Sequence, residues 1–298
     1  MEATELIKKV RKIEIKTRGL SRQVFAGEYH SVFKGQGMAF SEVRAYQYGD
    51  PIRNIDWNVT ARFNNPFIKI FEEERELTVM LIIDVSASKN FGTKQQFKQE
   101  LLTEIAAVLS FSAIQNNDKI GVIFFSNIIE KFIPPQKGRK HILRIIRELL
   151  DFKPQNKKTH IPQAISYFTN VIKKRCTAFL ISDFIQPMDE TSYDELYKRT
   201  TIANKKHDLI ALRIYDEREC TVPPMGLVKF EDAETGSIKW VDTSNKIIRD
   251  KYNSWWNTNN DKIEDIFKRS GVDYAKIKTN EDYVKPLMKL FKMREGRH

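Results

Sequence analysis

The alternation of apolar strands with amphipathic helices beyond residue 76 constrains the fold of this chain more than any other feature. Four continuous apolar runs have the length and composition of strands buried on both faces of a sheet. These runs are residues 76–86, 119–126, 177–184 and 207–216. The segments between them carry apolar residues at three- and four-residue steps, as helices with one buried face do. These helical segments are residues 93–116, 138–152, 161–175 and 194–206. The rhythm predicts an α/β domain with a doubly wound, mostly parallel sheet and helices on both faces.

Residues 226–242 interrupt this alternation. Two alternating runs flank Glu234, Thr235 and Gly236, a pattern typical of a β-hairpin. We therefore expect a hairpin, inserted near residues 222–245, at one end of the sheet. Beyond it the pattern predicts helices over 246–269 and 283–293 and a last strand over 272–279.

The first 75 residues have a different character. Residues 4–16 have the pattern of a short basic helix, and residues 24–75 combine crowded turn signals with short aromatic and β-branched runs. We therefore divide the chain into residues 1–75, a helix followed by a β-rich extension, and residues 76–298, the α/β domain with its hairpin.

Composition and charge exclude several classes of protein. The formal net charge of +11 is compatible with an anionic partner, which is a nucleic acid, an acidic membrane surface or an acidic protein. Apolar runs such as Val79–Ile83 are far shorter than the ~20 residues that a membrane helix needs. The first residues lack the apolar stretch of a secretory signal. The two cysteines, Cys176 and Cys220, are expected to be reduced thiols, which predicts a cytoplasmic protein.

Oxygen-bearing side chains follow the predicted strands at places that should meet in space. Asp84, Ser86 and Ser88 alternate on the loop after the first strand, Thr159 precedes a helix, and Asp183 follows the third strand. In open α/β sheets, ligands bind at the carboxyl ends of the strands. Carboxylates and hydroxyls are hard oxygen ligands that suit Mg²⁺ or Mn²⁺. The sequence therefore predicts a Mg²⁺ or Mn²⁺ site, partly bound through water, with an open position for an incoming carboxylate.

A purely structural interpretation of the same residues is also available. Ser86 and Ser88 can cap the next helix, and Asp183 can be a turn residue. The matching positions of Thr159 and Asp183 after later elements favour the metal site over this alternative.

The five residues of this set resemble the metal-ion-dependent adhesion site of the von Willebrand factor type A domain. Residues 27–62 resemble the segment that precedes such a domain in the bacterial "domain of unknown function 58" family. The matching landmarks are Ser31, Phe33, Gly35, Gly37, Phe40, Glu42, Arg44, Tyr46, Gly49, Asp50, Arg53, Asp56, Trp57, Ala61 and Arg62. The resemblance extends over residues 24–215.

This resemblance implies a function without catalysis. The family usually accompanies MoxR-type AAA+ ATPases. It implies a metal-dependent, protein-binding adaptor, or co-chaperone, that helps to assemble or activate other complexes. The partner, a MoxR-type ATPase or its client, would supply the carboxylate that completes the metal site.

One departure from the family pattern keeps another interpretation open. Two glycines commonly precede the threonine, but Lys157 and Lys158 stand there. Two lysines near an ion would repel it, although long side chains can turn outward. A scaffold that binds its partner without metal is therefore a further hypothesis.

An activity on phosphoesters, or binding of nucleic acid, is the alternative from a different class. The net charge and a Mg²⁺ site motivate it, but a positioned general base and the carboxylates of a second metal are missing from the pattern. Residues 131–158 hold nine Lys or Arg and two acidic residues, and Phe152 is the one Phe, Tyr or Trp in 137–158, so no series of aromatic side chains is interleaved for stacking on bases. This basic segment favours an acidic protein partner over nucleic acid.

Two further predictions concern the burial of tryptophan side chains. The cluster Asp50, Arg53, Asp56, Trp57 and Arg62 can be a binding patch, but we favour a buried Trp57 with ion pairs that pin this section to the α/β domain. In the pair Trp255-Trp256, we expect one ring in the core and one at the surface.

Overall fold

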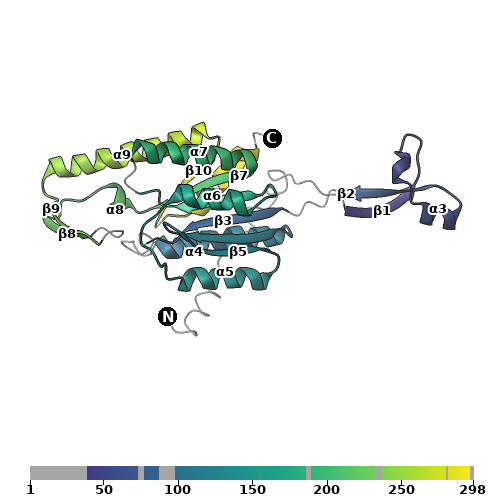
Figure 1. Cartoon of the computed structure of the whole chain (residues 1–298), viewed down its shortest axis with the longest axis horizontal. Helices are drawn as coiled ribbons and strands as arrows, with labels where there is room; N and C mark the ends of the chain where they lie inside the picture. Colours follow the sequence, from purple (N-terminus) through teal and green to yellow (C-terminus); the bar gives the residue numbers. More distant parts are fainter. Residues whose placement is uncertain are drawn as a thin grey trace. The chain divides into compact units, whose positions relative to one another are not determined.

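The structure is a computed structural model, and it describes residues 39–72, 77–86, 98–185, 189–231, 236–279 and 281–295 (Figure 1). These residues divide into two compact units, with the boundary between Leu77 and Thr78. The helix predicted over residues 4–16 and the predicted metal ligand Ser88 lie outside the described residues.

The smaller unit is built on a two-stranded antiparallel sheet. Strand β1 (Ala39–Ala45) pairs with β2 (Phe67–Glu72), and between them lie the 3-10 helix η1 (Ile52–Asn54) and helix α3 (Trp57–Phe63). Helix α3 begins after Asp56, whose carboxylate accepts hydrogen bonds from the backbone N–H groups of Asn58 and Val59, at 3.0 and 3.3 Å. Asp56 is therefore an N-cap, as its short acceptor side chain favours.

The charged cluster of this unit differs from the prediction. Arg44 forms the paired hydrogen bonds to Asp50, at 2.8 and 2.9 Å, in place of Arg53 or Arg62. Trp57 is 67% exposed, so the prediction of a buried ring is wrong. The physical reason is that α3, a helix of two turns beside a two-stranded sheet, buries none of its residues.

The larger unit contains a six-stranded sheet in the order β10-β7-β6-β3-β4-β5. Its strands are β3 (Thr78–Asp84), β4 (Lys119–Phe125), β5 (Ile129–Gln136), β6 (Thr177–Ser182), β7 (Asp208–Tyr215) and β10 (Asp273–Lys278). All neighbours pair in parallel except β4 and β5. The central strands are buried almost throughout because their side chains are apolar on both faces. The expected α/β fold with a mostly parallel sheet is confirmed.

Strand β5 is an element that the sequence pattern did not predict. It carries Pro134 and Pro135, which cannot donate to a ladder and therefore suit an edge strand. Its partner strand approaches closely at Gly121, where an added Cβ would lie 2.9 Å from the backbone nitrogen of Pro135. Only glycine fits at this contact without displacing backbone.

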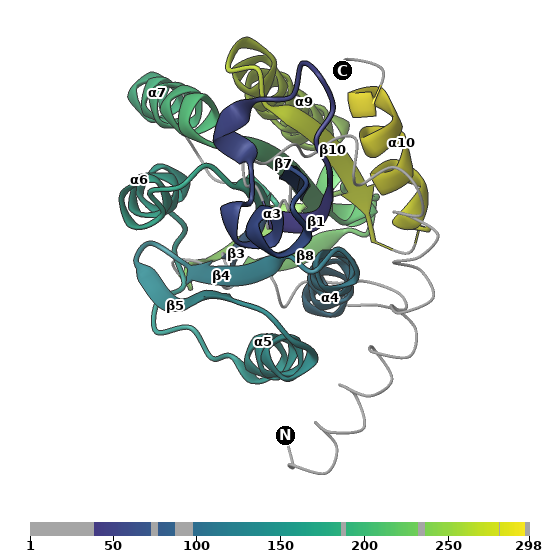
Figure 2. The same ribbon diagram turned by 90° about the vertical axis from the view of Figure 1, so that its right-hand side faces the viewer.

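Helices cover both faces of this sheet (Figure 2). Those on one face are α6 (Ile161–Val171), α7 (Glu190–Lys206) and α9 (Lys246–Arg269), and those on the other are α4 (Lys98–Gln115), α5 (Arg139–Asp151) and α10 (Val284–Glu295). Alternate residues of β3 divide between the two faces, and Met80 and Ile82 pack in the cluster that includes Phe168 of α6 and Phe267 of α9. The predicted division of the tryptophan pair is also confirmed, because Trp256 is buried and Trp255 is 39% exposed.

The expected hairpin follows the short helix α8 (Glu217–Cys220) at the carboxyl end of β7 (Figure 1). It consists of β8 (Leu227–Glu231) and β9 (Ile238–Asp242), paired antiparallel. Within the described residues, none of the helices is long and apolar enough to cross a membrane. Both cysteines are free thiols, and burial raises the pKa of Cys176 to about 12.

Candidate functional site

Asp84 is the first predicted ligand, and it lies at the carboxyl end of β3. Its side chain is 4% exposed. One carboxylate oxygen accepts a hydrogen bond from the backbone N–H of Ser86 at 3.0 Å, and the other accepts from the Ser182 hydroxyl at 2.8 Å. Burial, and then the negative charge of Asp183, raise the pKa of Asp84 to about 7, although the hydrogen bonds from Ser86 and Ser182 oppose this. The described groups around Asp84 therefore disfavour its ionised form.

Asp183 lies directly after the neighbouring strand β6. Its Oδ1 accepts a hydrogen bond from the backbone N–H of Ile185 at 3.1 Å. Between them, Phe184 adopts a left-handed backbone conformation with φ of 53° and buries its ring against Phe267, at 5.2 Å between ring centroids. The anchored Phe184 ring fixes the turn that aims Asp183 at the edge of the sheet.

The loop with Thr159 reaches the same edge from the other side of β3. The backbone N–H of His160 donates to the carbonyl of Ser126, directly after β4, at 3.1 Å. β4 is next to β3, and the backbone N–H of Val85 donates to the carbonyl of Phe125 at 2.8 Å. Thr159 is half-buried in this loop, whereas Lys157 and Lys158 are exposed. The topology thus places the described members of the predicted set, Asp84, Ser86, Thr159 and Asp183, at one edge.

Lys98 is a member of this site that the sequence analysis missed. It is 3% exposed, and its ammonium group donates to Asp183 Oδ2 at 3.0 Å and also to Glu219 of α8. Burial alone would lower the pKa of Lys98, but the charges of Asp183 and Glu219 outweigh it and raise the pKa. The lysine is therefore a permanent cation within the site.

Sequence signals for these missed residues do exist. Lys98 occupies the same helix face as Leu101, Leu102 and Ile105, and a charged residue on a buried stripe requires a buried partner. Glu219 follows the fourth predicted strand, where the reasoning applied to the first and third strands would have found it.

The charge of this cluster is the property that bears on metal binding. With Asp84, Asp183 and Glu219 ionised, these three carboxylates and the ammonium of Lys98 together carry a formal charge of −2. The donor atoms are hard oxygens, and each carboxylate oxygen can accept a second bond. In the part of the chain that the structure describes, no three His, Cys, Asp or Glu side chains form a metal-binding group. The donor set therefore fits Mg²⁺ or Mn²⁺ only when hydroxyls and water complete it.

The sequence matches a known protein family and several uncharacterised relatives. The model of a family described as "protein of unknown function DUF58" matches residues 42–262, well over half of the chain. Uncharacterised proteins of Mycobacterium tuberculosis (strain H37Rv) and Mycobacterium bovis are each 27% identical over 232 residues, which cover 77% of this chain and 71% of each relative.

A solved structure supports the fold. The structure of an aerotolerance-related membrane protein from Bacteroides fragilis, carrying multiple mutations to serines, aligns with a TM-score of 0.51 and 16% identity. The alignment covers 74% of this chain and 100% of that chain. The likeness at this level of identity concerns the fold alone.

Proposed function

The chain belongs to the DUF58 family of proteins of unknown function, and from this premise we propose that it is a non-enzymatic adaptor. The adaptor binds an acidic surface of another protein through a divalent metal ion at the carboxyl edge of its sheet. A MoxR-type AAA+ ATPase, or a client of such an ATPase, is the proposed partner, and the cytoplasm is the proposed location.

The observation that carries this proposal is the uncompensated charge at the edge of the sheet. Among the described residues, burial and the charge of Asp183 disfavour the ionised form of Asp84, while Lys98 is bound to Asp183 and Glu219. A divalent ion held by Asp84, Ser86 and Ser88, with Thr159 and Asp183 bound directly or through water, would supply an electrophilic position for a carboxylate of the partner.

Two surfaces of the chain suit a protein partner of this kind. The hairpin exposes large apolar side chains beyond the carboxyl end of β7, namely Leu227, Phe230, Ile238 and Trp240, each at least 39% exposed. Such groups on a projecting hairpin are typical of a protein-binding surface. Helix α5 exposes Arg139, Lys140, Arg144 and Arg147, which complement an acidic partner.

Calorimetric titration of the purified chain with Mg²⁺ and Mn²⁺ tests the metal. We expect saturable heat at millimolar metal, lost in Asp84→Asn. The matched control is Asp265→Asn, which changes a carboxylate that is 57% exposed and paired with Arg269. No heat from the natural chain, or equal heat from Asp84→Asn, would contradict the metal site.

Retention of a purified MoxR-type ATPase on the immobilised chain tests the partner. The expected retention requires Mg²⁺, disappears in EDTA and in Asp84→Asn, and weakens in Trp240→Ser. Trp240 is 65% exposed, so this last change leaves the core intact. Absence of retention in Mg²⁺ would refute this partner without bearing on the metal.

A metal-free scaffold is the second candidate, and Lys98 is the observation that favours it. Its ammonium group already occupies Asp183 Oδ2, so part of the negative charge has an internal counter-ion. The lysines that first suggested this alternative, Lys157 and Lys158, are instead exposed. Retention of the partner that survives both EDTA and Asp84→Asn would decide for this candidate.

A further inference from the structure

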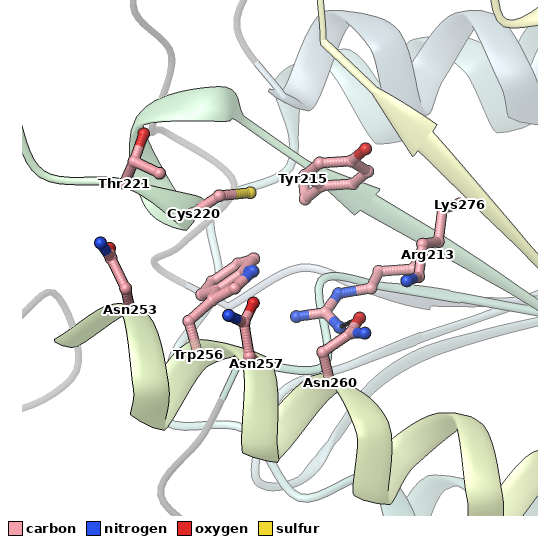
Figure 3. A pocket seen from close by; sticks show the side chains of 9 residues that line it. All are labelled: Arg213, Tyr215, Cys220, Thr221, Asn253, Trp256, Asn257, Asn260 and Lys276. Atoms are coloured by element: carbon pink, nitrogen blue, oxygen red, sulfur yellow. Dashed lines mark hydrogen bonds between the residues drawn. The ribbon is translucent and has the colours of Figure 1, made fainter. Parts of the chain in front are cut away.

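A polar cavity lies between α9 and the strands β7 and β10 (Figure 3). Its volume is about 370 Å³, which is in the range of small-molecule sites. Figure 3 shows Trp256, Asn257 and Asn260 projecting from α9 towards the side of the cavity that Arg213 of β7 lines, whereas Asn253 of α9 lies nearer to Thr221. No residue of this cavity belongs to the proposed metal site.

Arg213 is the unusual residue of this cavity. It is 1% exposed and is the largest fully buried side chain among the described residues. Its Nη1 donates to Asn260 Oδ1 at 2.6 Å, and the guanidinium lies over the Trp256 ring, 4.8 Å from the centroid. Nε and Nη2 are buried and have no hydrogen-bond partner among the described residues. The guanidinium is therefore held in place with two donors unused.

The neighbours of Arg213 do not balance its charge. Within the described part of the chain, the ion pairs include none between Arg213 and a carboxylate, and the nearby acid Glu264 pairs with Lys276. Burial raises the pKa of Tyr274 to about 12, although the charge of Arg213 and the approach of its donors to the phenol oppose this, so the phenol adds no negative charge beside Arg213. An arginine cannot lose its proton in a protein, so the buried positive charge persists.

A second unused group lines the same cavity. Asn253 Oδ1 is buried and has no hydrogen-bond partner among the described residues. Buried polar atoms without partners cost free energy, and most are satisfied in folded proteins. Arg213 and Asn253, which carry these unpartnered atoms, thus both line one cavity, and the ring of Trp256 lies between them.

We propose that this cavity binds a small molecule through an oxyanion, a carboxylate or a phosphate, that accepts hydrogen bonds from Nε and Nη2 of Arg213. Two oxygen atoms of a carboxylate or of a phosphate match the fork of donors on a guanidinium. A donor group of the same molecule bonds to Asn253 Oδ1, and its apolar part packs beside Trp256. Asn260 positions the guanidinium and does not itself need to touch the ligand.

Calorimetric titration of the purified chain in a chloride buffer tests this site, with inorganic phosphate and succinate as separate probes. The natural chain is expected to bind at least one of them saturably, and the comparison assigns the site to phosphates or to carboxylates. Arg213→Met keeps much of the apolar stem and is expected to abolish binding. Asn253→Asp, which adds a competing carboxylate, is expected to weaken binding at least about tenfold.

Arg269→Met is the matched control for this experiment. Arg269 also lies over an aromatic ring, 4.6 Å from the centroid of Tyr197, but it is exposed and paired with Asp265. Unchanged binding in Arg269→Met together with the losses in the cavity variants would support the proposal. Absence of saturable binding to both probes would overturn it, and so would binding that stays unchanged in Asn253→Asp or in a folded Arg213→Met.

Discussion

Lys98 of α4 and Arg213 of β7 are both buried cations, and they differ in how their charge is balanced. Lys98 donates to two carboxylates, Asp183 and Glu219. Arg213 has an amide and an aromatic ring as neighbours, with two donors unpartnered among the described residues. Counter-ions inside the protein offset the cost of burying a cation, whereas a buried cation without them bears that cost until a ligand balances its charge.

Removal of the Lys98 charge is the largest predicted effect. Lys98→Met would leave Asp183 and Glu219 buried beside each other without their cation. Breaking a buried pair in this way should lower the free energy of unfolding by about 3–5 kcal/mol. Urea denaturation measures this change, and its control is Lys131→Met.

The control differs in exposure and not in chemistry. Lys131 pairs with Glu148 while both side chains are about one-third exposed. Its removal should change the free energy of unfolding by at most about 1 kcal/mol. Equal effects of the two substitutions on the free energy of unfolding would show that the buried ion pairs of Lys98 matter no more than the exposed pair of Lys131.

His207 is a third buried basic residue. It stays neutral and therefore needs no counter-ion. Burial, and then Lys206 and Arg175, lower the pKa of His207 to about 4, and its ring packs against Phe168. Because the unfolded chain binds the proton more readily, stability is full above the unfolded pKa of about 6.5 and falls as the pH drops towards 4.

The predicted loss over that window is about 3 kcal/mol, from a shift of roughly two and a half pKa units. Urea denaturation across the window, compared between the natural chain and His207→Phe, isolates it from the carboxylates that titrate nearby. The substituted chain should lack this part of the pH dependence. Identical profiles of the two chains would show that His207 is not held neutral.

Removal of the Arg213 charge is predicted to have the smallest effect on stability. Arg213→Met discards a hydrogen bond to Asn260 and a ring contact, but it also discards an unbalanced buried charge. In a chloride buffer without phosphate or carboxylates, the free energy of unfolding should change by less than about 1 kcal/mol, because apolar replacement of buried ionic groups is often neutral. A loss as large as that of Lys98→Met, measured in the same urea series, would show that Arg213 is balanced internally.

The sequence predicts the scaffold of this protein better than its charges. Strands such as 177–184 are recognisable because every side chain is apolar, which leaves no other place for them than the sheet centre. Strand β5 was missed because Pro134 and Pro135 contradict a central strand, although they are compatible with an edge. Trp57 was misplaced because its aromatic character predicts burial, whereas the small unit offers it none.

The site was predictable only in the residues that follow strands directly. Asp84 and Asp183 are in that position, and the parallel pairing of β3 with β6 brings them to one edge. Lys98 reaches the edge from a helix, and the cavity of Arg213 depends on where α9 crosses β7 and β10. Such convergence depends on the distance between elements, which apolar periodicity does not encode. The one sequence signal for the cavity was Arg213, the lone arginine in the apolar run 207–216.

Metal binding at Asp84 is tested most directly by the free energy of unfolding. It is measured for the natural chain and for Asp84→Asn, each in EDTA and in millimolar Mg²⁺. At a pH of about 8, above the raised pKa of about 7, the ionised Asp84 destabilises the metal-free fold, by up to about 4 kcal/mol. In EDTA, Asp84→Asn should therefore be the more stable chain. Mg²⁺ at a hundred times its dissociation constant should add about 2.7 kcal/mol to the natural chain and nothing to Asp84→Asn. If Mg²⁺ changes neither chain, or both equally, the metal site at Asp84 is contradicted.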